Sequence, residues 1–184
     1  PLKTLIARNL RDNTERHFTA EALMIAAGRR SNSDELKPEK SGIEVDKKGF
    51  IVVNEYLETK KKNIYAFGDA IGIQMFRHAA NYEAGIVWHN ANHEHKVPMD
   101  FSATPHAVFT HPQIASVGFK EHEAKNKYEI AVGIAKYKDT AMGAAMGYPE
   151  GFVKVIVERE TGKILGAHIV GPEASVLIQE ITNA

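Results

Sequence analysis

The chain of 184 residues is long enough for one domain or two small ones, and its 43% hydrophobic and 25% charged residues are ordinary for a globular protein. Its 23 basic and 23 acidic residues leave no formal net charge, which argues against nucleic-acid binding through bulk charge. The lack of cysteine excludes a disulfide framework, a thiolate metal site, a cysteine nucleophile and a redox dithiol within this sequence.

The first residues do not have the pattern of a signal peptide or a membrane anchor. Charges at Lys3 and Arg8 interrupt the initial apolar run, and the longest purely apolar stretch, residues 22–27, is too short to cross a bilayer. We therefore expect a soluble, cytoplasmic protein with no membrane partner. Because the sequence begins with Pro1, we also expect it to be a piece of a longer chain.

Short apolar runs predict strands in the first half of the chain. Residues 3–7 and 22–27 have this character, and a polar stretch with Pro38 then predicts a loop with one helical turn over residues 29–42. Residues 43–45 and 50–53 flank the sequence DKKG, which suits a hairpin turn. Residues 64–67 form a further predicted strand, and apolar residues at helical spacing predict a long helix from residue 75 to about residue 93.

The second half of the chain reads as consecutive strands with a few helices. Strands are expected over residues 107–110, 114–119, 130–137, 152–157 and 164–170, and helices over residues 120–127 and 174–181, with a helix start possible at Pro172. The sequence ERETGK gives the strongest hairpin signal, whereas the glycines of residues 143–151 indicate a flexible connection. This order indicates an α+β fold.

The most informative segment for function is the predicted strand of residues 64–67, which ends in Gly68 and Asp69. Ligands of open α/β sheets bind at such strand ends, where glycine permits a close approach and a carboxylate can accept hydrogen bonds from sugar or polyol hydroxyls. A simple Gly-Asp turn is the alternative. Residues 74–78 should form the first turn of the long helix, whose free N–H groups suit an anionic ligand unless the turn is merely solvated.

Histidines cluster on and beyond the predicted helix. His89 and His93 are four residues apart and share a face, and His95 follows, but no carboxylate completes a recognised metal site. We therefore interpret the cluster as a solvated helix end and expect no metal. His78 is expected to make a structural or backbone contact and not to act as an acid or base.

Recognised catalytic and phosphate-binding motifs are not found in the sequence. No two glycines stand two residues apart, so the dinucleotide fingerprint is missing, and Gly162-Lys163 is followed by isoleucine and not by the serine or threonine of a phosphate loop. No Gly-x-Ser-x-Gly elbow is present either. Spacing alone therefore identifies no catalytic residues.

Five segments, in order, resemble the FAD-dependent pyridine nucleotide–disulfide oxidoreductases of the dihydrolipoamide dehydrogenase and mercuric reductase type. They are residues 26–32 (AAGRRSN), 59–70 (TKKKNIYAFGDA), 75–78 (MFRH) with Glu83 and Gly85, 109–118 (FTHPQIASVG), and 151–171 with Ala174 and Glu180. The likeness covers nearly the whole chain, and although each motif alone is weak, their shared order is specific.

The resemblance implies a C-terminal interface (dimerisation) domain with an antiparallel sheet and helices, an α+β unit preceded by part of an α/β FAD-binding domain. It assigns residues 1–31 to the end of an NAD(P)-binding domain, residues 32–100 to part of the central FAD-binding domain and residues 101–184 to a truncated interface domain. It also implies a homodimer in which each subunit completes the active site of the other.

The resemblance also implies a set of cofactor-binding residues and neither a catalytic residue nor a metal ligand. The cofactor-binding set is Gly28, Gly68, Asp69, Met75, Phe76, Arg77 and His78. Asp69 is expected to accept a hydrogen bond from a ribityl hydroxyl of FAD, the helix N-terminus to face the pyrimidine edge of the flavin, and Gly28 to lie beside the nicotinamide cofactor.

Two positions depart from the family pattern. Ser31 stands where the family usually has proline, and Arg77 replaces a usually small residue beside the flavin. The family's catalytic His-Pro-Thr motif, with a glutamate five residues past its histidine, is expected beyond the last helix. His111-Pro112 is not this motif, because Ser116 occupies the glutamate position.

The functional expectation is part of a flavoprotein that passes electrons between NAD(P)H, FAD and a redox disulfide. Its substrate is expected to be a small dithiol or disulfide, or a metal ion, and not a nucleic acid. Because this chain has no thiols, we expect it to be inactive alone. Because the loop that would bind the pyrophosphate of FAD is missing from it, we also expect it to retain FAD poorly. The alternative is a non-catalytic homodimerisation module.

Overall fold

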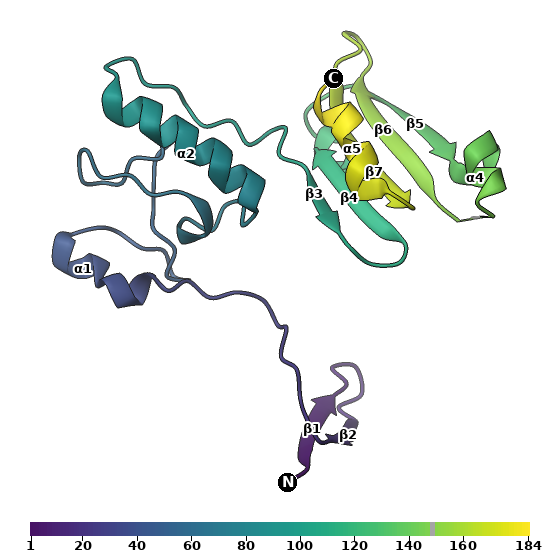
Figure 1. Cartoon of the computed structure of the whole chain (residues 1–184), viewed down its shortest axis with the longest axis horizontal. Helices are drawn as coiled ribbons and strands as arrows, with labels where there is room; N and C mark the ends of the chain where they lie inside the picture. Colours follow the sequence, from purple (N-terminus) through teal and green to yellow (C-terminus); the bar gives the residue numbers. More distant parts are fainter. Residues whose placement is uncertain (148–149) are drawn as a thin grey trace.

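The computed structural model describes residues 1–147 and 150–184 (Figure 1). Along the chain it forms an N-terminal hairpin, a central part around helix α2, and a C-terminal part built on a five-stranded sheet. Among the described residues, no helix has the length and apolar character needed to cross a membrane.

The N-terminal hairpin pairs β1 (Lys3–Arg8) with β2 (Glu15–Ala20) in an antiparallel register that sets Leu5 opposite Phe18. The predicted strand at residues 3–7 is confirmed, but the prediction of a strand at residues 22–27 is wrong. Those residues have no regular secondary structure, and Met24 and Ile25 are exposed. An apolar run becomes a strand only where another strand can pair with its backbone, and no described strand lies beside this one.

The central part contains two short 3₁₀-helices, one short α-helix and the long helix α2, separated by turns. They are η1 (Ser33–Leu36), α1 (Pro38–Ser41), η2 (Gly68–Ala70) and α2 (Arg77–Asn92). The loop with a helical turn predicted for residues 29–42 is therefore confirmed. A small core of Leu57, Ala66, Ile71 and Met99 packs against apolar side chains of α2 and neighbouring loops.

The hairpin turn predicted between residues 43–45 and 50–53 is confirmed. Val45 and Ile51 form an antiparallel bridge, and Asp46 Oδ1 accepts hydrogen bonds from the N–H groups of Lys48 and Phe50. The expected strand of residues 64–67, however, is reduced to one bridge, between Glu58 and Tyr65. Turn hydrogen bonds satisfy these backbones, so no extended ladder forms.

Helix α2 begins at Arg77, two residues later than predicted. Phe76 caps it with extended dihedral angles (φ −125°, ψ 141°), so Met75 and Phe76 precede the helix and do not form its first turn. Near the other end, the buried side chain of Asn90 donates to the carbonyls of Tyr56 and Val97 and accepts from Val97 N–H. These bonds tie the helix to both flanking loops.

The C-terminal part is an antiparallel sheet in the order β3-β4-β7-β6-β5. Its strands are β3 (His106–Val108), β4 (Gln113–Gly118), β5 (Ile130–Lys136), β6 (Phe152–Glu158) and β7 (Ile164–Gly171). Its helices are α3 (Glu121–Lys125), η3 (Tyr137–Asp139), α4 (Ala141–Ala145) and α5 (Ala174–Thr182). All five predicted strands and both predicted helices are present, which confirms the α+β fold.

Two details of this part differ from the expectation. The final helix starts at Ala174 and not at Pro172, and α4 occupies the beginning of the segment expected to be a flexible connection; Pro149, in the same segment, lies outside the described residues. Helix α5 covers one face of the sheet over β4 and β7 (Figure 1). Alternate strand residues, including Val117 and Ile169, pack there against Ile178.

Candidate functional site

The turn of Gly68 and Asp69 lies directly before the N-terminal end of α2 in the central part. Gly68 is buried with a φ of +67°, a conformation that favours glycine, and its N–H donates to Glu83 Oε2 of α2. Asp69 follows with a side chain that is 66% exposed. The turn therefore holds a buried backbone and presents a solvent-accessible carboxylate.

Arg29 joins this carboxylate to the entry of α2. Its Nη1 atom donates to the Met75 carbonyl oxygen at 2.6 Å and lies 3.6 Å from Asp69 Oδ2. One guanidinium thus brings together three segments that are up to 46 residues apart in the sequence. Arg29 was not among the predicted site residues; only its place beside Gly28 in the segment AAGRRSN could have indicated it.

The start of α2 carries the remaining predicted residues. Because the helix begins at Arg77, the first-turn N–H groups of Arg77, His78 and Ala79 have no intrahelical partner, and the dipole of this 16-residue helix places its positive end there. The side chains of Arg77 and His78 are exposed, whereas Met75 and Phe76 are half-buried.

An aromatic stack connects this helix start to the C-terminal sheet. The Phe76 ring lies between His78, with a centroid separation of 5.5 Å, and His106 of β3, with one of 5.9 Å. His78 Nε2 donates to the Pro105 carbonyl oxygen at 2.7 Å. This bond confirms the expectation that His78 makes a structural backbone contact.

Gly28 and Ser31 lie on either side of the arginine pair formed by Arg29 and Arg30. Gly28 has a φ of +98° and open space where a side chain would begin, so its conformation and not crowding favours glycine. Ser31, at the position where proline was expected, is buried, and its Oγ accepts a hydrogen bond from Ser33 N–H at 3.2 Å. A side-chain bond therefore holds this turn.

The histidines at the C-terminal end of α2 form hydrogen bonds with backbone carbonyl groups. His89 Nε2 donates to the His95 carbonyl and His93 Nδ1 donates to the His89 carbonyl, while the His89 and His93 rings stack with centroids 4.4 Å apart. Among the described residues, no group of three or more His, Cys, Asp or Glu side chains is placed to hold a metal ion.

Two carboxylates with lowered pKa values belong to ion pairs outside this site. Hydrogen bonds from Lys125 and Lys154 lower the pKa of Glu121 to about 2, and a hydrogen bond from Lys96 lowers the pKa of Glu58. Glu58 also accepts a hydrogen bond from Asn63 N–H, and Lys96 also donates one to Tyr65 Oη. These charges connect surface elements of the fold and are not gathered around Asp69.

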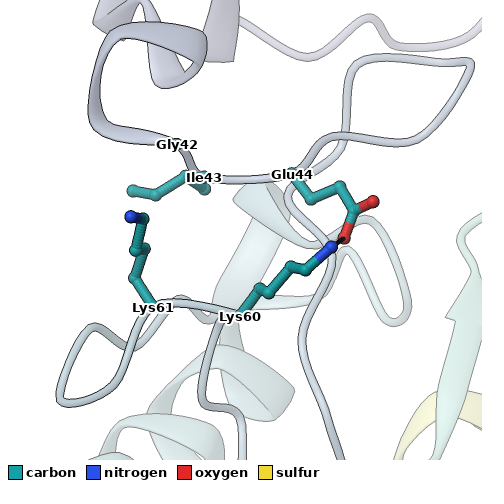
Figure 2. Close-up of a pocket in the computed structure, with 5 residues that line it drawn as sticks. All are labelled: Gly42, Ile43, Glu44, Lys60 and Lys61. Atoms are coloured by element: carbon teal, nitrogen blue, oxygen red, sulfur yellow. Dashed lines mark ion pairs between the residues drawn. The ribbon is translucent and has the colours of Figure 1, made fainter.

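Two hollows lie away from the Asp69 turn. Figure 2 shows one of about 480 Å³, where Lys61 points towards Gly42 and Lys60 Nζ pairs with Glu44 Oε2 at 3.5 Å. The second, of about 460 Å³, is a largely apolar cavity between β5, α4 and α5. It is lined by Ala135, Lys136, Tyr137, Thr140, Met142, Gly143, Met146, Val153, Pro172, Glu173 and Leu177.

Family models match most of the chain. Residues 3–85 match the model described as pyridine nucleotide-disulphide oxidoreductase, and residues 104–184 match the model of the dimerisation domain of the same group. The first match includes Arg29, Asp69 and the start of α2. The second includes the whole five-stranded sheet.

Curated relatives and solved structures agree with these matches. Mycothione reductase of Mycobacterium tuberculosis is 42% identical over 91% of this chain and 38% of its own length. Dihydrolipoyl dehydrogenase 3 of Haloarcula marismortui is 38% identical over 89% of this chain and 34% of its own length. The crystal structure of LpdA from M. tuberculosis superposes with a TM-score of 0.83 and 26% identity over 91% of this chain and 37% of that one. The HOCl-induced flavoprotein disulfide reductase RclA from Escherichia coli superposes with a TM-score of 0.80 and 29% identity. That match covers 91% of this chain and 39% of RclA. The chain thus spans little more than a third of these relatives.

Proposed function

The chain belongs to the pyridine nucleotide-disulphide oxidoreductase family. From that premise we propose that its central part forms one side of a flavin site and that its C-terminal part is an association domain. The observation that carries the proposal is the grouping of Asp69, the Met75 carbonyl and the N-terminus of α2 around the single guanidinium of Arg29. The members of this family are FAD-dependent NAD(P)H–disulfide oxidoreductases.

The residues of this site fit the flavin end of FAD. The exposed Asp69 carboxylate can accept hydrogen bonds from ribityl hydroxyls, and the free N–H groups of the first turn of α2 favour partial negative charge at a ring edge. Gly28 and Arg29 are proposed to border the nicotinamide side. When bound, FAD supplies two-electron transfer between NAD(P)H and a disulfide.

For the whole protein we propose the reaction type of its relatives. Electrons pass from NAD(P)H through FAD to a redox disulfide, or in the reverse direction, and the final substrate is a small dithiol or disulfide, or a metal ion. The redox cysteines are not among the residues of this chain, which contains no cysteine. The role of this chain is therefore to orient the cofactor and to associate.

The boundaries of this division are part of the proposal. Residues 1–31 are assigned to the end of an NAD(P)-binding domain, residues 32–100 to part of the FAD-binding domain and residues 101–184 to the interface domain. The change from isolated bridges to a continuous sheet between these last two segments supports the second boundary.

A homodimer is the proposed assembly, since the dimerisation-domain model of the family matches residues 104–184. The proposed contact is the apolar cavity between β5, α4 and α5, where Met142 is 71% and Leu177 is 40% exposed. Apolar side chains grouped in this way are typical of surfaces that another protein covers. A non-catalytic homodimerisation module remains the second candidate function, favoured by this same cavity.

Binding of flavin by the purified chain separates the two candidates. Riboflavin fluorescence is titrated with the wild-type chain, and FAD and ADP are added as competitors. We expect weak binding in which FAD competes with riboflavin and ADP does not, because the site contacts the flavin end. D69A should weaken riboflavin binding about tenfold, since it removes a hydrogen bond to a charged acceptor.

The control for this titration is D139A, which removes an aspartate from η3 in the C-terminal part. Equal riboflavin affinity of D69A and D139A, or competition by ADP as strong as that by FAD, contradicts the proposed flavin site. Association without any flavin binding favours the homodimerisation module.

A further inference from the structure

Helix α2 contains a buried carboxylate to which the proposed site gives no role. Glu83 is 0% exposed, its Oε2 accepts the hydrogen bond from Gly68 N–H, and its Oε1 is buried without a hydrogen-bond partner among the described residues. A buried carboxylate with one unpartnered oxygen is costly, so an apolar residue would serve better if this position only filled the core.

Among the residues that the structure describes, Glu83 has one hydrogen-bond partner, the backbone N–H of Gly68 in the Asp69 turn. Ala80 and Glu83 are three residues apart and therefore share a face of α2. A Cβ added at Gly68 would lie 3.3 Å from Ala80 Cβ, so the turn packs closely on that face. From the same face, Glu83 Oε2 accepts the hydrogen bond from Gly68 N–H. The helix thus provides a small side chain and an acceptor to one peptide unit.

The position of this peptide unit decides where the Asp69 carboxylate lies. Asp69 is the next residue, and its short side chain has little reach of its own. Its Oδ2 lies 3.6 Å from Arg29 Nη1, which at the same time donates to the Met75 carbonyl. A shift of the Gly68 backbone would therefore move Asp69 relative to both Arg29 and the start of α2.

We propose that Glu83 is a positioning residue that fixes the Asp69 carboxylate for the ribityl chain of the flavin, acting through Gly68 N–H and touching no ligand itself. The inference rests on the proposed function, because it assigns a role in the same site. The hydrogen bond from Gly68 N–H ties the turn to a buried side chain of α2, which suits a turn that must not shift when the ligand binds.

The test compares E83A and E83Q with N90A. Asn90 is buried on the same helix about two turns further on, and its loss should destabilise the fold without reaching the Asp69 turn. For each variant the riboflavin affinity, the thermal midpoint and the amide NMR signals of Gly68 and Asp69 are measured. E83Q keeps an acceptor of the same shape and provides a folded variant even where E83A does not fold.

We expect riboflavin binding about tenfold weaker in E83A and about threefold weaker in E83Q, with unchanged affinity in N90A despite its lower thermal midpoint. The protection of the Gly68 amide from hydrogen exchange should be lost in E83A, reduced in E83Q and unchanged in N90A. Affinity losses that merely follow the thermal midpoints of all three variants overturn the positioning role.

Failure of the proposed function is recognised separately. If the wild-type chain does not bind riboflavin, the flavin proposal fails, and the amide signals still decide the role of Glu83. Shifts confined to Gly68, Asp69 and the start of α2 in the Glu83 variants support the positioning role. Unchanged signals at these residues, or the same shifts in N90A, overturn it.

Discussion

Arg29 shows how single residues assemble this site. The sequence identifies Asp69 from its place after Gly68, and the structure adds an arginine from a segment 40 residues earlier as the contact that joins it to α2. Both side chains are more than half exposed, so their ion pair contributes little to stability. Its consequence is geometric, because it keeps the carboxylate beside the helix start.

His168 of β7 is the residue whose protonation should affect the stability of the C-terminal part. Its Nε2 donates to the Phe119 carbonyl at 3.2 Å, and its Nδ1 lies 2.9 Å from Ser116 Oγ, from which the neutral ring accepts a hydrogen bond. Burial lowers the pKa of His168 from its usual 6.5, against the opposing effect of the Phe119 carbonyl, and the charges of Lys154 and Lys120 lower it further.

The stability of the chain is therefore predicted to fall with acidification below about pH 6.5. In this range the unfolded histidine binds a proton and the folded one does not, so protonation favours unfolding and stability rises with pH. Urea unfolding is measured at about pH 7.5 and about pH 5.5 for the wild type and H168Q. The difference between the two pH values should be smaller in H168Q.

The exposed His17 of the N-terminal hairpin provides the control for this prediction, since H17Q removes a histidine without altering the five-stranded sheet. H17Q should keep the wild-type pH dependence. The role assigned to His168 is wrong if H168Q and H17Q lose the same amount of stability between the two pH values.

At the scale of elements, β4 and β7 pair through two glycines at one end of their register. Gly118 and Gly166 are directly opposite in the register. A Cβ added at Gly166 would lie 2.2 Å from the Phe119 carbonyl oxygen, and one at Gly118 would lie 2.3 Å from the Leu165 carbonyl oxygen. Both obstacles are backbone atoms, which cannot turn aside as a side chain can. The chain leaves β4 through this contact and enters α3.

Substitution of Gly166 tests this close approach. We expect G166A to reduce the free energy of unfolding by about 2–3 kcal/mol, because the backbone of residues 118–119 must shift. G133A in β5 is the matched control: no atom lies within 4 Å of the added Cβ, and alanine should be neutral or stabilising by about 0.5 kcal/mol. Urea unfolding of both variants provides the measurement, and equal effects refute the expected crowding.

At the scale of the whole molecule, the C-terminal part contains the cavity that we propose as the association surface. Its apolar lining comes from β5, α4 and α5, with Tyr137 holding the edge through a hydrogen bond from its Oη to the Pro172 carbonyl. Helix α5 also covers the sheet core through Ala174 and Ile178. The same helix would therefore connect the core of one subunit to the surface of the next.

A charge placed in this cavity should weaken association. L177E is expected to raise the dimer dissociation constant at least about tenfold, because it buries an unpaired carboxylate in an apolar contact. V52E introduces the same charge at an exposed apolar residue of the central part and should not affect association. Size-exclusion chromatography with light scattering measures the mass, and a wild-type chain that stays monomeric at high concentration argues against the homodimer.

The sequence alone determined the elements whose signals are local. The five strands of the C-terminal part, its helices α3 and α5 and the course of α2 follow from periodicity, and the Gly68-Asp69 turn follows from its two residue types. The tertiary structure decided that residues 22–27 are not a strand, that Arg29 joins Asp69 to Met75, and that Glu83 supports Gly68. These features depend on which distant segments meet, and such meetings are set by packing and hydrogen-bond partners that no local pattern contains.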